Sequence, residues 1–169
     1  MKSLAIDASS TCTGWSVFED GKYVSSGFID LKKDKNADHR IFEMAKRIGE
    51  FIEHYQPDKI ILEDTMMSSN VSTLKMLANL AGAIKFYCYL HNFELETLYP
   101  SEWRKFLHIQ EKGAKRTELK NKAFNVCIDQ LGLDSLEEDQ AEAVCINLSV
   151  AVRDGLFQLK EIDDSHLWD

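Results

Sequence analysis

The sequence predicts an α/β fold: a mixed five-stranded sheet, with a three-strand antiparallel meander and two parallel strands, flanked by helices. Five short apolar or alternating segments have the length of strands, and helical apolar spacing begins only after the third. Asp20-Gly21, between the second and third segments, is a strong hairpin signal. The 169 residues are 44% hydrophobic, which predicts one domain over residues 1–156 with a short acidic tail at 157–169.

The first three strands are expected at Lys2–Asp7, Gly14–Phe18 and Tyr23–Leu31. Both residues of Asp20-Gly21 tolerate the positive φ that a two-residue hairpin requires. The N-terminal part of the sheet is therefore expected to be an antiparallel meander.

Helices alternate with two further strands in the rest of the chain. Asp38 is expected to cap a helix that ends near Tyr55, and Ser101 to cap a short helix that ends at Phe106. The apolar run Lys59–Glu63 is typical of a buried parallel strand. The other elements expected are a helix at Asn70–His91, a strand at Glu94–Tyr99, a helix within Lys112–Leu131 and a helix at Glu137–Val152. A meander followed by such units is the order of the ribonuclease H-like fold.

Acidic residues end two of these strands and recur on the last helix. Asp7 ends the first strand and Glu63 the buried one, and a charge there is costly unless it faces a cleft or a cation. Asp139 and Glu142, three residues apart, share one helix face. Mg²⁺ prefers oxygen ligands, and two ions about 3.5–4 Å apart can cut a phosphodiester. The pattern therefore predicts a metal site whose crowded carboxylates have raised pKa values.

Each acid also has an ordinary structural interpretation. Strand-end acids often cap a following turn, and Asp139, beside Glu137 and Glu138, is of a kind that often faces solvent. Only the combined pattern favours the metal site.

Three groups of segments resemble motifs of the RuvC-type Holliday junction resolvases of bacteria and phages. These are Ala5–Ser10 with Thr13–Trp15, Gln56–Asp58 with Ile61–Glu63, and Asp139–Ala143. The resemblance extends from about residue 3 to residue 152.

The resemblance implies a homodimeric, metal-dependent endonuclease that cuts four-way junctions and other branched DNA. It implies Asp7, Glu63, Asp139 and Glu142 as ligands of two Mg²⁺ ions per site, with Mn²⁺ as an alternative, and Lys115 as the group that steadies the phosphate. Glu142 stands where the bacterial pattern usually has Asp.

Two further features bear on DNA and on dimerisation. Met66 stands where the family has an aromatic wedge, so it would either unstack bases or simply pack. The helix Asn70–His91 offers apolar residues for a dimer interface or for the core: Leu74, Leu77, Leu80, Ala81 and Ile84.

The chain has a net charge of −8, which argues against a general nucleic-acid coat protein. Against this acidic background, one cluster of basic residues stands out. We expect its members to contact DNA phosphates, although a solvated helix face is the commoner role of such a run. The residues expected to bind DNA are Arg104, Lys105, Lys112, Lys115 and Arg116, together with Met66 and Asn70, and Lys120 and Lys122 extend the run.

Composition also limits where the protein works. No apolar run reaches the roughly 18 residues of a membrane span, and Met1–Ser3 does not begin a signal peptide, so a cytoplasmic protein without a membrane partner is expected. Its cysteines are expected to be reduced and mostly buried: Cys12, Cys88, Cys127 and Cys145.

Three other functions stay open. An actin-like or sugar-kinase-like ATP phosphotransferase also has an Asp and small residues after its first strand, but it uses two domains and a second glycine-rich loop. A ribonuclease H-like nuclease acting on structured RNA would share the acids. A catalytically inactive DNA-binding relative would not need all four.

Overall fold

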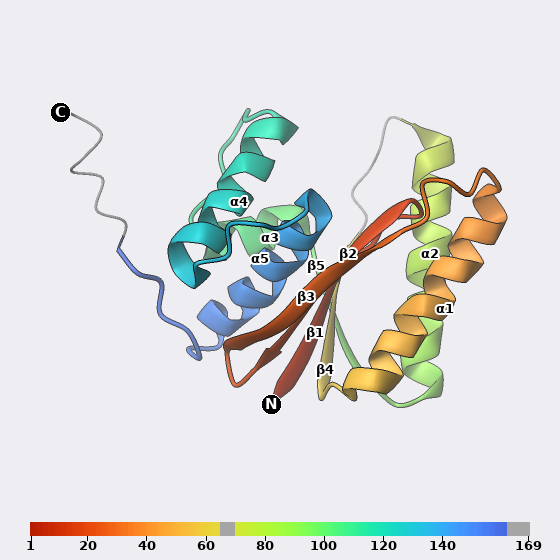
Figure 1. Cartoon of the computed structure of the whole chain (residues 1–169), viewed down its shortest axis with the longest axis horizontal. Coiled ribbons are helices and arrows are strands. Elements are labelled where there is room, and N and C mark those ends of the chain that lie inside the picture. The colour runs from red at the N-terminus through yellow and green to blue at the C-terminus, as the bar shows by residue number, and fades with distance from the viewer. Residues whose placement is uncertain (65–69, 162–169) are drawn as a thin grey trace.

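The computed structural model describes residues 1–64 and 70–161 and contains one five-stranded sheet with helices on both faces (Figure 1). The strands are β1 (Lys2–Asp7), β2 (Cys12–Glu19), β3 (Lys22–Asp30), β4 (Lys59–Glu63) and β5 (Glu94–Leu98). The helices are α1 (Ala37–Tyr55), α2 (Val71–Leu90), α3 (Pro100–Phe106), α4 (Arg116–Leu131) and α5 (Glu138–Arg153). The predicted α/β class and the order of elements are confirmed.

The strands lie in the order β3-β2-β1-β4-β5. β1, β2 and β3 pair antiparallel, whereas β4 is parallel to both β1 and β5. Asp20 (φ 49°) and Gly21 (φ 76°) both adopt positive φ, as the hairpin between β2 and β3 requires. The C-terminal ends of β1 and β4 therefore meet at one edge of the sheet.

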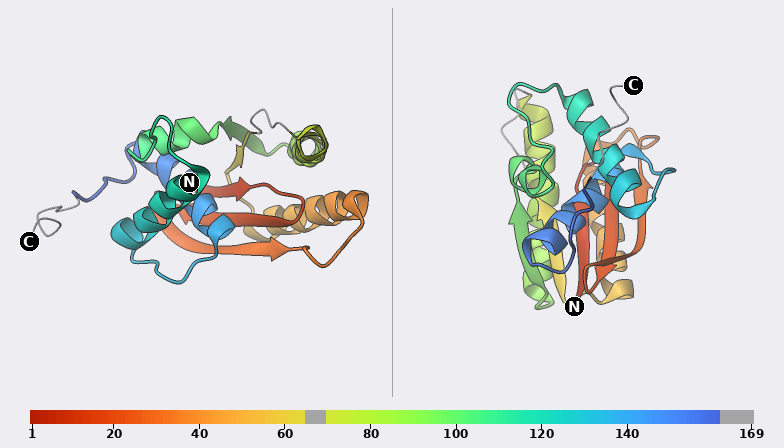
Figure 2. Two further views of the ribbon diagram at one scale, coloured as in Figure 1. Left: turned by 90° about the horizontal axis from the view of Figure 1, so that it is seen from above. Right: turned by 90° about the vertical axis from the view of Figure 1, so that its left-hand side faces the viewer.

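Alternating side chains of β1 divide the interior into two cores. Leu4 and Ile6 pack with residues of α1 and α2, whereas Ala5 packs with residues of α3, α4 and α5. Figure 2 shows these helix groups on opposite sides of the sheet. α5 is buried along most of its length, so it lies between the sheet and α4.

Helix N-termini differ from the predictions in two places. Asn36, not Asp38, caps α1, because its side chain accepts the backbone N–H of His39 at 3.0 Å. α3 begins at Pro100 rather than after Ser101, since proline at a first helical position has no N–H to satisfy.

Other predictions are confirmed. All four cysteines are free and buried. Gly132, in the left-handed conformation (φ 72°), ends α4. None of the helices in residues 1–64 and 70–161 is long and apolar enough to cross a bilayer. The predicted wedge Met66 and the end of the predicted tail, residues 162–169, lie outside the described residues.

Candidate metal centre

Two carboxylates meet where β1 and β4 end side by side. Ile6 of β1 pairs in parallel with Leu62 of β4, so the next residues, Asp7 and Glu63, are neighbours at the edge of the sheet. Both side chains are partly buried. The pairing of these two strands thus fixes half of the candidate centre.

α5 supplies the other half. Carboxylate oxygens of Asp7, Asp139 and Glu142 all lie within 4.8 Å of one another. Glu63 is not part of that tight group, but its charge is the largest single electrostatic influence on Asp7. The structure therefore brings the four predicted acids together at one edge of the sheet.

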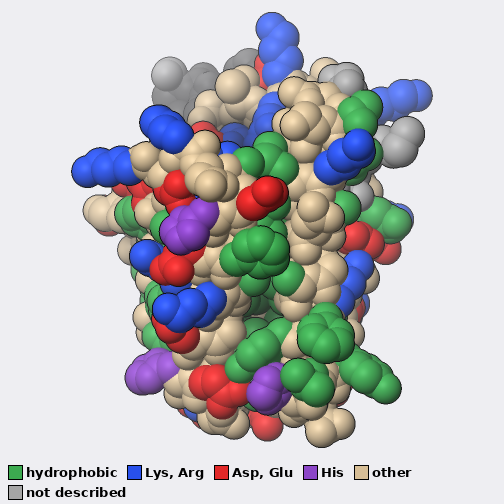
Figure 3. Space-filling model, turned by 90° about the vertical axis from the view of Figure 1, so that its right-hand side faces the viewer, with side chains coloured by type: hydrophobic (Ala, Val, Ile, Leu, Met, Phe, Trp, Pro, Cys, Tyr) green, Lys and Arg blue, Asp and Glu red, His purple; other side chains and the backbone are tan. Residues whose placement is uncertain are grey.

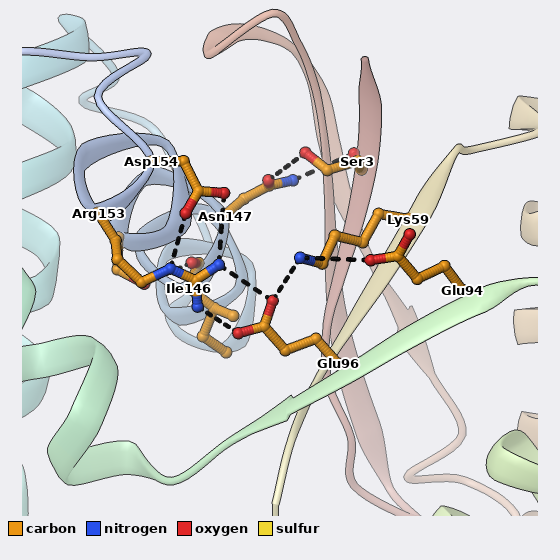
Figure 4. Close-up of polar contacts among 9 residues, drawn as sticks. Ser3, Lys59, Glu94, Glu96, Ile146, Asn147, Arg153 and Asp154 are labelled. Carbon is orange, nitrogen blue, oxygen red and sulfur yellow. Dashed lines mark hydrogen bonds and ion pairs between the residues drawn. The ribbon is translucent and has the colours of Figure 1, made fainter.

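Polar contacts hold α5 against the strands. Asn147 accepts a hydrogen bond from Ser3 Oγ at 2.6 Å and donates to the carbonyl of Ser16 at 3.0 Å, and the contact with Ser3 is visible in Figure 4. Arg153, at the C-terminal end of α5, pairs with Glu96 of β5 (Figure 4). These bonds fix how far α5 extends toward the acids on the strands.

The N-terminal end of α5 lies directly on β2 at Gly14. A Cβ atom at Gly14 would lie 1.8 Å from the carbonyl oxygen of Asp139, which is far inside any permitted contact. Gly14 is therefore needed because α5 crosses the strand there. Any side chain would displace Asp139.

Crowding and burial raise the pKa values of the acids on the strands. The pKa of Asp7 lies well above its ordinary value, first because the carboxyl is buried and then because Glu63, Glu142 and Asp139 repel its charge. Burial raises the pKa of Glu63 to about 7, and a hydrogen bond from Trp103 opposes this increase. The predicted raised pKa values are confirmed for these two groups.

This set of donors fits a hard divalent cation. All four groups offer oxygen, the donor that Mg²⁺ prefers. A cation among them would offset the mutual repulsion that raises the pKa of Asp7. The residues present therefore suit Mg²⁺ or Mn²⁺.

Two cations lie against Glu142, whose side chain is only 8% exposed. Arg104 Nη2 donates to Glu142 Oε1 at 3.2 Å, and Lys120 Nζ lies 3.8 Å from Glu142 Oε2 while also pairing with Glu138. Arg104 was predicted to bind DNA, and the structure places it beside the acids. Lys120 was predicted only as an extension of the basic run, and its spacing from the buried Ala123 and Cys127 places it on the inward face of α4.

The structure places the other predicted DNA-binding residues that it describes at the protein surface and at helix N-termini. Lys105, Lys112, Lys115 and Arg116 are exposed, and the charge of Arg116 lowers the pKa of Glu63. Lys115 stands at the N-cap of α4, where its backbone N–H is bound by Glu118 at 2.8 Å. Asn70 caps α2 by accepting the backbone N–H of Thr73 at 3.2 Å.

Trp103 of α3 is a site residue that the sequence did not reveal. Its side chain is completely buried, and its Nε1 donates to Glu63 Oε2 at 2.6 Å. In the sequence, an aromatic residue in a short helix indicates only core packing.

Comparisons with known proteins agree with this arrangement. The sequence model of the family described as "Crossover junction endodeoxyribonuclease RuvC" matches residues 3–127, which include Asp7 and Glu63 but end before α5. A curated relative of that name from Neisseria meningitidis is 26% identical over 158 residues, covering 90% of this chain and 86% of the relative. One from Chromohalobacter salexigens is 28% identical over 153 residues, covering 88% and 79%.

Solved structures share the fold. RuvC of T. thermophilus in complex with a Holliday junction substrate superposes with a TM-score of 0.71 at 16% identity, covering 96% of this chain and 99% of that one. The Fowlpox virus resolvase, solved with Holliday junction DNA, gives a TM-score of 0.63 at 16% identity, covering 93% and 100%. The ribonuclease H-like architecture predicted from the order of elements is confirmed.

Proposed function

The chain belongs to the RuvC family of crossover junction endodeoxyribonucleases, and we propose that it cuts four-way DNA junctions, and other branched DNA, by metal-dependent hydrolysis. One observation carries the proposal: carboxylates from β1 and α5 lie within 4.8 Å of one another, with Glu63 of β4 beside them. Carboxylates this close repel one another, so the arrangement destabilises the fold unless a cation or a substrate binds there.

Asp7, Glu63, Asp139 and Glu142 would hold the metal. When bound, two divalent ions lower the pKa of water and stabilise the leaving oxygen of a phosphodiester. The carboxylates then act as ligands rather than as proton carriers. The donor set accommodates either Mg²⁺ or Mn²⁺.

The neighbouring cations would receive the phosphate. Arg104 and Lys120 already lie at Glu142, so they can neutralise a strand that approaches the acids. Lys105, Lys112, Lys115 and Arg116 are exposed on α3, on α4 and between them, where they would add salt-sensitive affinity for the DNA backbone. In this proposal Lys115 remains a phosphate contact.

A homodimer would supply the two active sites that a symmetric junction needs. Figure 3 shows apolar side chains gathered along the middle of the face formed by α1 and α2. Phe86 is 64% exposed and Tyr89 82% exposed on α2, and Gly82 on the same helix has open space around it. We therefore place the dimer contact on the outer face of α2.

Three of the apolar residues of α2 predicted for a dimer interface or for the core are not available for that contact. Leu80, Ala81 and Ile84 are buried in the monomer's own core, with residues of α1 and of the sheet, so core packing explains them. The dimer surface therefore follows the exposed residues of α2 instead.

A labelled four-way junction provides the test. The wild-type chain should cut it with Mg²⁺ and not with EDTA, and Asp7→Asn should abolish cutting while still binding the junction. Asp129→Asn, an exposed acid near the C-terminal end of α4, is the matched control and should cut normally. Full cutting by Asp7→Asn would refute the proposal.

Further substrates separate the alternatives. Flap and Y-shaped DNA measure the breadth of branch recognition, and an RNA junction of matched shape tests the ribonuclease alternative. Hydrolysis of ATP without any DNA cutting would favour the phosphotransferase.

A further inference from the structure

A buried tryptophan of α3 contacts one of the acids of the candidate centre. The side chain of Trp103 is 0% exposed, and it packs in the core beneath α5 with Ala141 and Val144. Its indole N–H nevertheless donates to Glu63 Oε2 at 2.6 Å. A residue needed only to fill space would not require this polar contact, because phenylalanine or leucine also fills cores.

The next residue of α3 contacts another of the acids. Arg104 donates to Glu142 Oε1 at 3.2 Å, and its guanidinium carbon lies 4.7 Å from the centre of the Trp103 ring. Two consecutive residues of one short helix thus touch acids that come from β4 and from α5. α3 therefore links the two halves of the centre.

Glu63 needs such support because its side chain is long. A glutamate has several rotatable bonds, so a carboxylate without a fixed partner samples many positions. A charge-assisted hydrogen bond from a buried ring selects one of them. Because Oε2 accepts the indole hydrogen bond, the position of the other carboxylate oxygen, Oε1, is fixed as well.

We propose that Trp103 is a positioning residue whose indole N–H fixes the rotamer of Glu63 for metal binding. This inference rests on the proposed function, because it takes Glu63 to be a metal ligand. Hydrogen-bond partners that orient metal ligands typically contribute 10–100-fold to affinity. Trp103 acts through Glu63 and need not touch the metal or the DNA.

Trp103→Phe tests the inference, because it keeps an aromatic ring and removes the N–H donor. Isothermal titration with Mn²⁺ alone should show binding weakened by about 10–100-fold. Junction binding in EDTA should stay unchanged, and cutting at saturating Mg²⁺ should recover to within a few-fold of the wild-type rate. Trp15→Phe is the matched control, since Trp15 packs on Phe51 and Tyr55 on the other face of the sheet.

Two outcomes separate this inference from the proposed function. Mn²⁺ binding by folded Trp103→Phe within 2-fold of the Trp15→Phe control would overturn the inference and leave the function standing. A wild-type chain that neither binds Mn²⁺ nor cuts junctions would overturn both.

A second measurement does not depend on the folding of Trp103→Phe. In the ¹⁵N-labelled wild-type chain, the indole N–H resonance of Trp103 should shift when Mg²⁺ is added. The same resonance should shift in Glu63→Ala, which removes the acceptor. An indole resonance that responds to neither change would overturn the inference.

Discussion

Gly14→Ala should impair cutting far more than it impairs folding. The added methyl group would lie 1.8 Å from the carbonyl oxygen of Asp139 and 2.3 Å from its carbonyl carbon. Because both are backbone atoms, no side-chain rotation can relieve the contact. Either β2 or the N-terminal end of α5 must move.

The size of the effect follows from the distances. An ordinary contact needs at least 3.4 Å, so the backbone must give way by about 1.6 Å. Overpacking of this kind costs about 1–3 kcal/mol, which lowers the melting temperature of a chain of this size by roughly 2–12 °C. A displacement of about 1 Å at reacting groups costs on the order of 100-fold in rate. Asp139 lies at the contact, so most of the loss should appear in cutting.

Initial rates of junction cutting at 25 °C and saturating Mg²⁺ measure the loss, and thermal melting measures the stability. Ile52→Ala is the stability control, since Ile52 is fully buried in the core on the α1 side and its truncation costs about 2–5 kcal/mol. It should destabilise at least as much yet cut at nearly the wild-type rate. If Gly14→Ala cuts within about 3-fold of Ile52→Ala, the close approach of α5 to β2 does not position Asp139.

Three further predictions concern charge, metal and assembly. The pKa of Glu63 is raised from 4.5 to about 7, so between these pH values the folded chain holds a proton that the unfolded chain has lost. The free energy of unfolding without metal should therefore fall by up to about 3 kcal/mol as the pH rises from 4.5 to 7. Glu63→Gln should reduce this slope in chemical denaturation with EDTA, while the raised pKa of Asp7 keeps part of it, and an unchanged slope would contradict the assignment. Mg²⁺ should raise the melting temperature of the wild-type chain at pH 8 but not that of Asp139→Asn, because only ligands that bind the folded state stabilise it; equal shifts would place the metal elsewhere. Gly82→Arg should convert dimers to monomers in sedimentation without loss of helicity, since nothing in the described residues lies within 4 Å of a Cβ added there; a dimer that persists would exclude this face of α2.

Local patterns explain how the four acids come to lie together. Asp7 and Glu63 follow apolar strands that pair in parallel, so the sheet alone brings them together. Asp139 and Glu142 share one face because helical spacing requires it. Only the direction from which α5 approaches the sheet needed the three-dimensional structure.

The supporting residues could not be predicted, because they depend on tertiary packing. Trp103 reaches Glu63 across 40 positions of sequence through a short helix whose placement no local pattern fixes. Gly14 gains its importance only from the crossing of α5. Lys120, rather than Lys115, lies against Glu142 because α4 turns its Ala123 face inward.

Anomalous diffraction from crystals soaked in Mn²⁺ tests most directly whether the acids of β1, β4 and α5 together hold divalent metal. Strong peaks among Asp7, Glu63, Asp139 and Glu142 are the predicted result. Mn²⁺ peaks bound elsewhere, with these four carboxylates free of metal, would contradict it.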